Sequence, residues 1–203
     1  MGRVLGKDFF VRRPDLVAKE LLGKVLVRKI ADDVLKGMIV ETEAYYGPED
    51  PASRARRGKL PHNRFMWEEP GTIFIYMVHG NWLLNVVTEP KGVPSAVLIR
   101  AVKPLQGIQR MLRNRKVSDV RNVANGPGKL SKAFMITKDL NGLKVYDPEG
   151  PVTIVDEGFS GFKVGRSYRI GVKEDLDVPL RFYIVDEIEY VSKPPVRKAS
   201  KLD

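Results

Sequence analysis

The sequence predicts a single compact α+β domain built on a mainly antiparallel sheet. Its 203 residues suit one domain with a sizeable core and are few for two. Predicted strands outnumber predicted helices, and short turns join most of them, which favours antiparallel pairing. Hydrophobic residues make up 43% of the chain and charged residues 30%, as in ordinary globular proteins. We expect the domain to span residues 1–192, with a basic, mobile tail at residues 193–203.

The first half of the chain contains one helix signal and two strand signals. Residues 15–22 predict a short helix, because apolar side chains recur at helical spacing before Gly23. In residues 24–30 and 34–45, apolar residues either alternate with polar ones or form continuous runs, and many are β-branched. This pattern is typical of strands. Residues 47–69 are basic and rich in turn residues, so they predict a long loop. Loops of that length inside a compact domain are usually functional.

The second half begins with a hairpin signal. Residues 72–78 and 83–88 predict two strands, and His79-Gly80-Asn81-Trp82 between them predicts a β-hairpin. Residues 95–102 predict a further strand, and residues 105–115 a basic amphipathic helix. Asn125-Gly126-Pro127-Gly128 breaks the chain before a helix at residues 129–136. Shorter strands are expected at residues 152–155, 168–171 and 180–185.

Residue usage excludes several kinds of chemistry. Cysteine is absent and only two histidines occur, His62 and His79. Disulfides, thiol catalysis, iron–sulfur clusters, cysteine-ligated zinc and a histidine-rich metal site are therefore excluded. No apolar run approaches the roughly 20 residues that span a bilayer. Residues 1–13 also lack the apolar stretch of a secretion signal. We therefore expect an intracellular protein with no membrane-spanning segment.

The charge distribution indicates a polyanionic partner. The formal net charge is +10, and such an excess attracts phosphate-rich molecules because neutralising phosphates releases counterions. Nucleic acid is the first candidate and an anionic membrane surface the second, while solubility alone is the simplest alternative. Residues 51–66 carry five Lys or Arg and no acid, and residues 105–132 carry seven against one Asp. Both segments are candidate phosphate-facing surfaces.

Two glutamates and a tyrosine form a candidate catalytic group. Alternate residues of a strand share a face, so Glu41, Glu43 and Tyr45 are expected on one side, with the carboxylates about 6–7 Å apart. A carboxylate there could act as a general base for a water, beside a ring that stacks on a flat ligand. Two alternatives stay open: a solvated strand face, or a metal site that adds Glu49 and Asp50.

Two further motifs are weaker by themselves. In the hairpin, Phe74, Tyr76 and Val78 share one face, which could be a stacking surface. Trp82 at the tip lies where core packing does not require a ring, so it could be a wedge for the DNA minor groove. Gly126-Pro127-Gly128-Lys129 lacks the spacing of a P-loop. Its glycine-rich entry to a basic helix nevertheless offers free N–H groups to a phosphate; an ordinary helix start is the alternative.

Five motifs taken in order carry a resemblance. They are Glu41-Thr42-Glu43-Ala44-Tyr45-x-Gly47-Pro48-Glu49-Asp50-Pro51-Ala52, Pro61-x-Asn63-Arg64, Pro70-Gly71-Thr72, Leu98-Ile99-Arg100-Ala101 and Gly126-Pro127-x-Lys129-Leu130. In this order they resemble the alkyladenine (3-methyladenine) DNA glycosylase family over residues 40–130, with a looser similarity at residues 169–172 and 179–183. The resemblance implies a single DNA glycosylase domain with a curved antiparallel sheet, flanking helices and a protruding β-hairpin that probes the DNA minor groove.

The resemblance also implies roles for matching residues. Glu43 corresponds to the general base that deprotonates the attacking water, and Arg100 to the arginine that helps to hold that water. Tyr45 and Tyr76 correspond to the aromatic walls of the pocket for the flipped base. Asn85 corresponds to the asparagine at the pocket floor, with a gap of one residue after the hairpin turn. Contacts with the DNA backbone are expected at Arg64, Gly128 and Lys129.

Two positions depart from the family pattern. Where the family has a histidine opposite the tyrosine wall, this chain has Arg54, which offers donors only and always carries charge. A nearby guanidinium should disfavour cationic bases such as 3-methyladenine, unless it turns toward a phosphate. At the hairpin tip, where the family wedges a tyrosine into the gap left by the flipped base, this chain has His79, whose smaller ring stacks less.

The implied activity is hydrolysis of the bond between a damaged purine and its sugar in double-stranded DNA, without strand cleavage. The purine could be hypoxanthine, ethenoadenine, 3-methyladenine or 7-methylguanine. No metal or organic cofactor is implied. We expect a monomer with no obligatory protein partner, in the cytoplasm or nucleoid of a prokaryote. The alternatives are a non-catalytic protein that binds damaged DNA and a metal-dependent nuclease.

Overall fold

The computed structural model describes residues 2–193, so the tail expected at residues 193–203 lies outside the described residues except for Lys193. The strands in the described part are β1 (Arg3–Val4), β2 (Val25–Ile30), β3 (Asp33–Tyr45), β4 (Ile73–Val78), β5 (Asn81–Thr88), β6 (Ser95–Gln106), β7 (Val152–Asp156), β8 (Val164–Ser167) and β9 (Arg181–Ile184). The α-helices there are α1 (Pro14–Glu20), α2 (Ile108–Arg115) and α3 (Pro127–Ala133). Short 3-10 helices lie at Lys7–Phe9, Arg64–Trp67, Val120–Asn122, Lys138–Leu140 and Val185–Tyr190.

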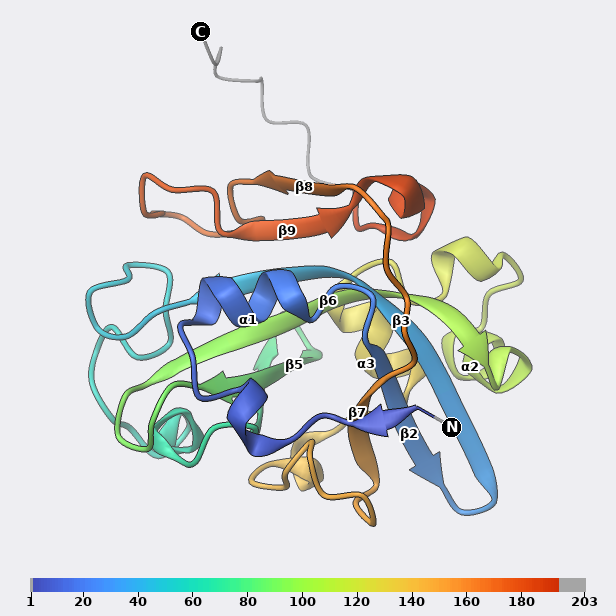
Figure 1. The fold of residues 1–203 in the computed structure, drawn as a ribbon, viewed down its shortest axis with the longest axis horizontal. Coiled ribbons are helices and arrows are strands. Elements are labelled where there is room, and N and C mark those ends of the chain that lie inside the picture. The colour runs from blue at the N-terminus through green and yellow to red at the C-terminus, as the bar shows by residue number, and fades with distance from the viewer. Residues whose placement is uncertain (1, 194–203) are drawn as a thin grey trace, which may run out of the picture.

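One sheet contains all nine of these strands. Its main path runs β1-β7-β2-β3-β6-β5-β4, and the β8–β9 hairpin joins it at β3 (Figure 1). Every pairing in the described part is antiparallel. The sheet therefore confirms the expected class, a single α+β domain with a mainly antiparallel sheet.

Strand β3 positions the candidate site. It pairs with β6 on one side, and on the other side first with β2 and then with β9. Against β6 the register is irregular, because Glu41 lies opposite Ala101 whereas Thr42 lies opposite Ile99. Arg100 is therefore an extra residue on β6, the β-bulge arrangement that re-aims a side chain.

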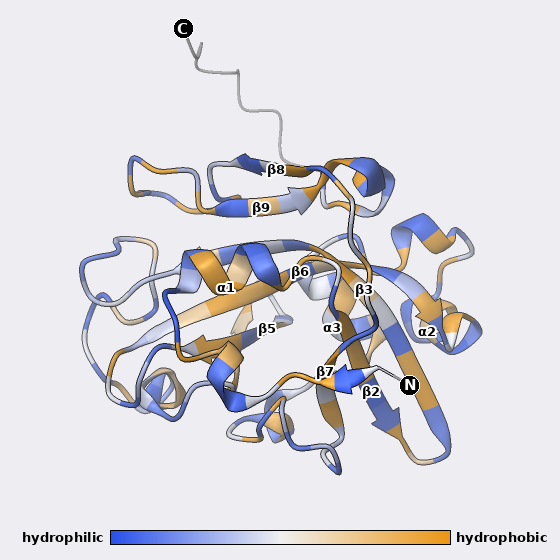
Figure 2. Ribbon diagram, viewed as in Figure 1, coloured by the Kyte–Doolittle hydropathy of each residue, from blue (hydrophilic) through white to orange (hydrophobic). Residues whose placement is uncertain are grey.

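Helices cover the sheet and complete the core. α1 packs against β3 and β6, and α3 packs against β5 and β6. Figure 2 shows hydrophobic residues running along β5 and β6. The largest side chains fully buried in the main core include Phe10, Leu21, Leu26, Ile99 and Phe134. None of the helices within residues 2–193 combines the length and the apolar character of a membrane span.

The hairpin turn is tighter than expected. Strands β4 and β5 pair until Val78 lies opposite Asn81, so only His79 and Gly80 form the turn. Their φ angles of 46° and 73° are both positive, as in the two-residue turns that match strand twist. Trp82 consequently lies within β5 and packs against the main core. The expectation that core packing does not require this ring is therefore wrong.

Two other element boundaries differ from the prediction. Strand β6 continues through Gln106, and α2 begins only at Ile108 because Gly107, with a φ of 73°, turns the chain. The prediction of a strand at residues 168–171 is wrong, because β8 ends at Ser167 and these residues form an irregular segment. The side chain of Arg169 turns instead into the protein, where it pairs with carboxylates. The other predicted helices and strands occur within a few residues of their expected bounds.

Substitution of Gly107 by alanine should destabilise the fold through a steric clash. A Cβ atom there would clash with Cδ2 of Leu35 and would lie 2.9 Å from the carbonyl oxygen of Val34. Gly58, with a φ of 77°, has open space around its Cβ position, so Gly58→Ala is a matched control for backbone strain. We expect Gly107→Ala to lose about 1–3 kcal/mol more unfolding free energy than the control, as overpacking does. Chemical denaturation measures both, and equal losses would contradict the clash.

Candidate active site

Arg100 joins the two glutamates of β3. The carboxylates of Glu41 and Glu43 are fully buried and lie on the same strand face, as predicted. The Nε of Arg100 donates to Glu41 at 3.0 Å, and its Nη1 donates to Glu43 at 3.1 Å. Burial acts to lower the pKa of Arg100, but the two carboxylates outweigh it and raise that pKa above its ordinary value. Arg100 therefore stays charged, and the alternative of a solvated glutamate face is wrong.

Glu41 has a second arginine and a serine as partners. Arg181 of β9 donates from Nε at 2.6 Å, and Ser192 donates from its backbone N–H at 2.8 Å and its hydroxyl at 2.7 Å. Together with Arg100, these donors come from three segments that are all far from Glu41 in the sequence. Glu41 therefore joins β3 to β9 and to the last described residues.

Glu43 has a different set of partners. Besides Arg100, the Tyr45 hydroxyl donates to it at 2.8 Å and the backbone N–H of Ile170 at 2.7 Å. Burial and the nearby Glu43 carboxylate raise the pKa of Tyr45 well above its ordinary value, so the phenol remains a donor. A carboxylate has about four acceptor positions. The described donors occupy three of them.

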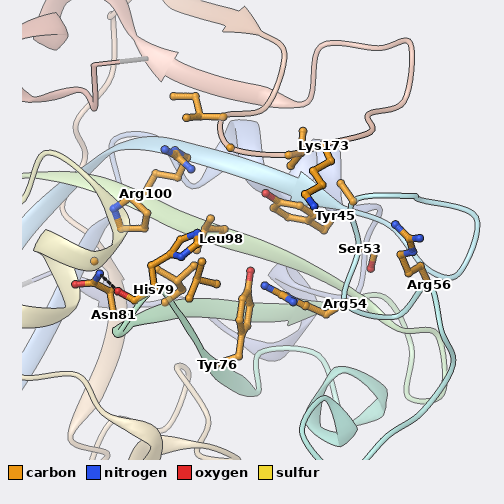
Figure 3. Close-up of a pocket in the computed structure, with 18 of the residues that line it drawn as sticks. Tyr45, Ser53, Arg54, Arg56, Tyr76, His79, Asn81, Leu98, Arg100 and Lys173 are labelled. Atoms are coloured by element: carbon orange, nitrogen blue, oxygen red, sulfur yellow. Dashed lines mark hydrogen bonds between the residues drawn. The ribbon is translucent and has the colours of Figure 1, made fainter. Parts of the chain in front are cut away.

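A cavity of about 570 Å³ opens beside these residues. Figure 3 shows that the end of β3, the loop after it, the hairpin and the entry to α3 all contribute to its walls. The lining includes six of the residues predicted from the sequence: Tyr45, Arg54, Tyr76, His79, Arg100 and Gly128. Glu43 is not in the lining itself, but its partners Tyr45, Arg100 and Ile170 are.

The remaining predicted residues lie elsewhere. Asn85 is buried, and its side-chain amide donates to the carbonyl oxygens of Phe74 at 3.2 Å and Leu83 at 3.1 Å, outside the cavity lining. Lys129 donates to the side chain of Asn125 at 2.8 Å. Arg64 lines a second cavity of about 360 Å³, with His62, Phe65 and Lys138 among its neighbours. Their predicted roles stay predictions.

Arg54 contacts one of the predicted aromatic walls. Its guanidinium carbon lies 4.5 Å from the centre of the Tyr76 ring. Burial raises the pKa of Tyr76, although the Arg54 charge acts in the opposite direction. Tyr76 therefore stays neutral and offers its ring face to a cation.

Arg169 connects several parts of the site, although the sequence analysis predicted no role for this residue. It donates to Asp50 at 2.6 and 2.8 Å, to Asp175 at 2.9 Å and to the carbonyl oxygen of Ala44 at 2.9 Å. Its guanidinium carbon also lies 4.6 Å from the Tyr45 ring centre. This arginine follows β8 in an irregular segment, where no periodic pattern signals burial. The looser similarity at residues 169–172 was the single signal that pointed to it.

The acidic residues do not form the alternative metal site. Arg169 occupies both carboxylate oxygens of Asp50, and arginines hold Glu41 and Glu43. Glu49 is exposed. In residues 2–193, no group of three or more acidic or histidine side chains is arranged to hold a metal ion. The observed partners thus favour an ion-pair network over metal coordination.

A buried carboxylate lies behind a cavity with aromatic walls, in a strongly basic chain. This arrangement is suited to an enzyme that acts on a flat ligand. The model of the methylpurine-DNA glycosylase family matches residues 8–188. A protein from Aeropyrum pernix is 42% identical over 99% of both chains, and one from Prosthecochloris aestuarii is 44% identical over 98% of this chain and 97% of its own. A third, from Koribacter versatilis, is 41% identical over 93% and 92%. All three are named provisionally as 3-methyladenine DNA glycosylases.

The chain therefore belongs to the methylpurine-DNA glycosylase family. It is a DNA glycosylase, a hydrolase of N-glycosyl bonds that acts in the base-excision repair of damaged purines. Its substrate is accordingly DNA, in agreement with the charge of +10.

Glu41→Gln should destabilise the protein strongly. The substitution leaves Arg100 and Arg181 buried with one carboxylate fewer, and breaking a buried ion pair typically costs about 3–5 kcal/mol of unfolding free energy. Glu20→Gln is the control, because Glu20 pairs with Arg12 at the surface, where its side chain is 50% exposed, and such pairs contribute about 0–1 kcal/mol. Denaturant unfolding measures both variants. Similar losses would mean that the buried network does not stabilise the fold.

Proposed function

We propose that this glycosylase flips a damaged purine out of duplex DNA and hydrolyses its N-glycosidic bond with activated water, leaving an abasic site. The damaged purine is an alkylated, deaminated or etheno-modified base. The proposal includes a monomer that needs no protein partner and neither a metal nor an organic cofactor. The prokaryotic sources of the relatives favour action on nucleoid DNA. The carrying observation is the buried Glu43 carboxylate, whose donors Tyr45 and Arg100 line the cavity.

The surface around the cavity suits base flipping. A base inside a duplex hides its glycosidic carbon, so the nucleotide must be extruded at a cost of a few kcal/mol. His79 is exposed at the hairpin turn and lines the cavity. In the proposal its imidazole fills the gap that the extruded base leaves. Arg64, Gly128 and Lys129 hold the DNA backbone, which agrees with the excess of basic side chains.

The cavity then holds the base between aromatic rings. Tyr45 and Tyr76 line it from different strands, and both phenols are neutral. Stacking on such rings tolerates many base structures, so selection among purines requires polar contacts. We assign Asn85 to discrimination against the exocyclic amine of guanine. It is buried outside the lining, but it contacts Leu83 and pairs with Leu98, which both line the cavity.

Glu43 performs the chemical step in this proposal. The oxygen of a water attacks the sugar C1′ while the C1′–N9 bond breaks and its electron pair leaves with the purine. The proton of the water passes to Glu43. Its negative charge also stabilises the positive charge that develops on the sugar. Arg100 donates to the carboxylate at 3.1 Å and orients it.

The burial of Glu43 adds a requirement. Three donors occupy three of its four acceptor positions, and the side chain is fully buried. The fourth position, on the Oε1 that accepts from Ile170, is the one we assign to the attacking water. Tyr45 or the segment around Ile170 must therefore shift when DNA binds, so that water reaches the carboxylate.

Glu43→Gln should remove base release and leave binding of damaged DNA nearly intact. The amide keeps the size of the side chain but cannot accept a proton from water, and a general base contributes about 10²- to 10⁴-fold to a rate. Single-turnover release from single-lesion duplexes, read by alkaline cleavage at abasic sites, measures the effect. Glu49→Gln is the control, since Glu49 is exposed six residues further along the chain. Full activity in Glu43→Gln would exclude the proposed base.

The reaction should stop at the abasic site. A glycosylase that also cuts the strand needs an amine nucleophile, and the mechanism proposed here uses water. Incubation without alkali should leave the strand intact, borohydride should trap no covalent complex, and EDTA should not reduce activity. Spontaneous strand breaks or a trapped complex would contradict water as the nucleophile, and loss of activity in EDTA would indicate metal dependence.

A further inference from the structure

The side chain of Arg54 is directed at the base cavity. Its guanidinium stacks on Tyr76 at 4.5 Å, and the residue lines the cavity (Figure 3). Its backbone carbonyl accepts from Asn63 at 2.7 Å, which anchors the loop that carries it. Within residues 2–193, no Asp or Glu forms a salt bridge with the Arg54 side chain. The guanidinium is therefore an uncompensated cation held against a wall of the pocket.

The other charges around the cavity do not cancel it. Glu41 and Glu43 neutralise Arg100, and Glu174 lies 4.0 Å from Arg56. Lys173 adds a further positive charge to the lining, and Glu174 is the one acidic residue among the lining residues. Arg54 and Lys173 are both exposed, so a base that enters the cavity displaces part of the solvent that screens their charges and then feels them more strongly than it would in open water.

We propose that Arg54 is a specificity-determining residue, which makes the pocket select neutral purines that present acceptor atoms over cationic N-alkylated purines. This inference rests on the proposed function. The planar guanidinium fork donates to paired acceptors, and O6 with N7 of a 6-oxopurine is such a pair. Hypoxanthine is a neutral damaged base with this edge. In 7-methylguanine the N7 acceptor is blocked and the base is cationic.

The charge that the purine acquires as it leaves also favours neutral bases in the presence of Arg54. The electron pair of the C1′–N9 bond departs with the base, so a neutral purine gains negative charge as the bond breaks. Arg54 stabilises that charge through its donors. A cationic purine becomes neutral on leaving, but it must first enter the pocket against the charge of Arg54. The guanidinium therefore raises kcat/KM for the neutral base and lowers it for the cationic base.

The test compares Arg54→Gln with the wild-type protein on duplexes that contain one hypoxanthine or one 7-methylguanine. The quantity measured is the ratio of kcat/KM for the two bases, with released base determined by chromatography. We expect the wild type to favour hypoxanthine and the ratio to fall about 10- to 100-fold in Arg54→Gln, as loss of a charged hydrogen-bond donor predicts. Arg54→Lys keeps the charge without the planar fork and should still disfavour 7-methylguanine.

Arg57→Gln is the matched control. Arg57 is exposed in the same loop and does not line the cavity, so its ratio should equal that of the wild type. An unchanged ratio in Arg54→Gln, or an equal shift in Arg57→Gln, would overturn the role of Arg54 while leaving the glycosylase mechanism intact. Absence of release from both bases by the wild type would overturn the mechanism and the inference together.

Discussion

A buried ion network around Arg100 joins strands β3, β6 and β9. Two carboxylates of β3 and two guanidiniums, from β6 and β9, lie together with almost no exposure to solvent. Charges of this kind are tolerated in a protein interior only when they are paired and their hydrogen-bonding positions are filled. The β-bulge at Arg100 meets this demand, because it turns the arginine toward both carboxylates. The ion pairs between these arginines and glutamates therefore stabilise the strand order β9-β3-β6, as does the burial of apolar side chains.

Two glutamates on one strand face acquire different chemistry through their neighbours. Glu41 accepts from two arginines and from Ser192, so its oxygens hold the C-terminal part of the described chain against β3. Glu43 accepts from one arginine, a phenol and a backbone amide. All three donors to Glu43 line the cavity. Of the donors to Glu41, Arg100 alone lines it, and Arg181 and Ser192 do not. Position in the fold, and not residue type, therefore separates a structural carboxylate from a candidate catalytic one.

The cavity depends on loops that have little regular structure of their own. Arg169 ties the segment after β8 to Asp50 and to the end of β3, and it backs the Tyr45 ring. The tight turn at His79 and Gly80 brings His79 into the lining of the same cavity. Arg100 and Arg169 thus hold the residues of the inner wall in place, and Arg54 adds a positive charge to the cavity. The relatives are named for an alkylated base; on the proposal that Arg54 determines specificity, the loop that carries Arg54 sets the substrate preference of this chain.

Local sequence patterns were enough to predict the α+β class, the positions of β2, β3, β4 and β9, and the shared face of Glu41, Glu43 and Tyr45. These follow from local periodicity, because a strand alternates its side chains wherever it is placed. Ordered motifs also determined the family. Only the tertiary structure decided that Trp82 belongs to the core, that Asn85 lies outside the cavity lining, and that Arg169, Arg181 and Ser192 complete the site. Such contacts join residues up to 151 positions apart, and the register and bulge that create them leave no local pattern in the chain.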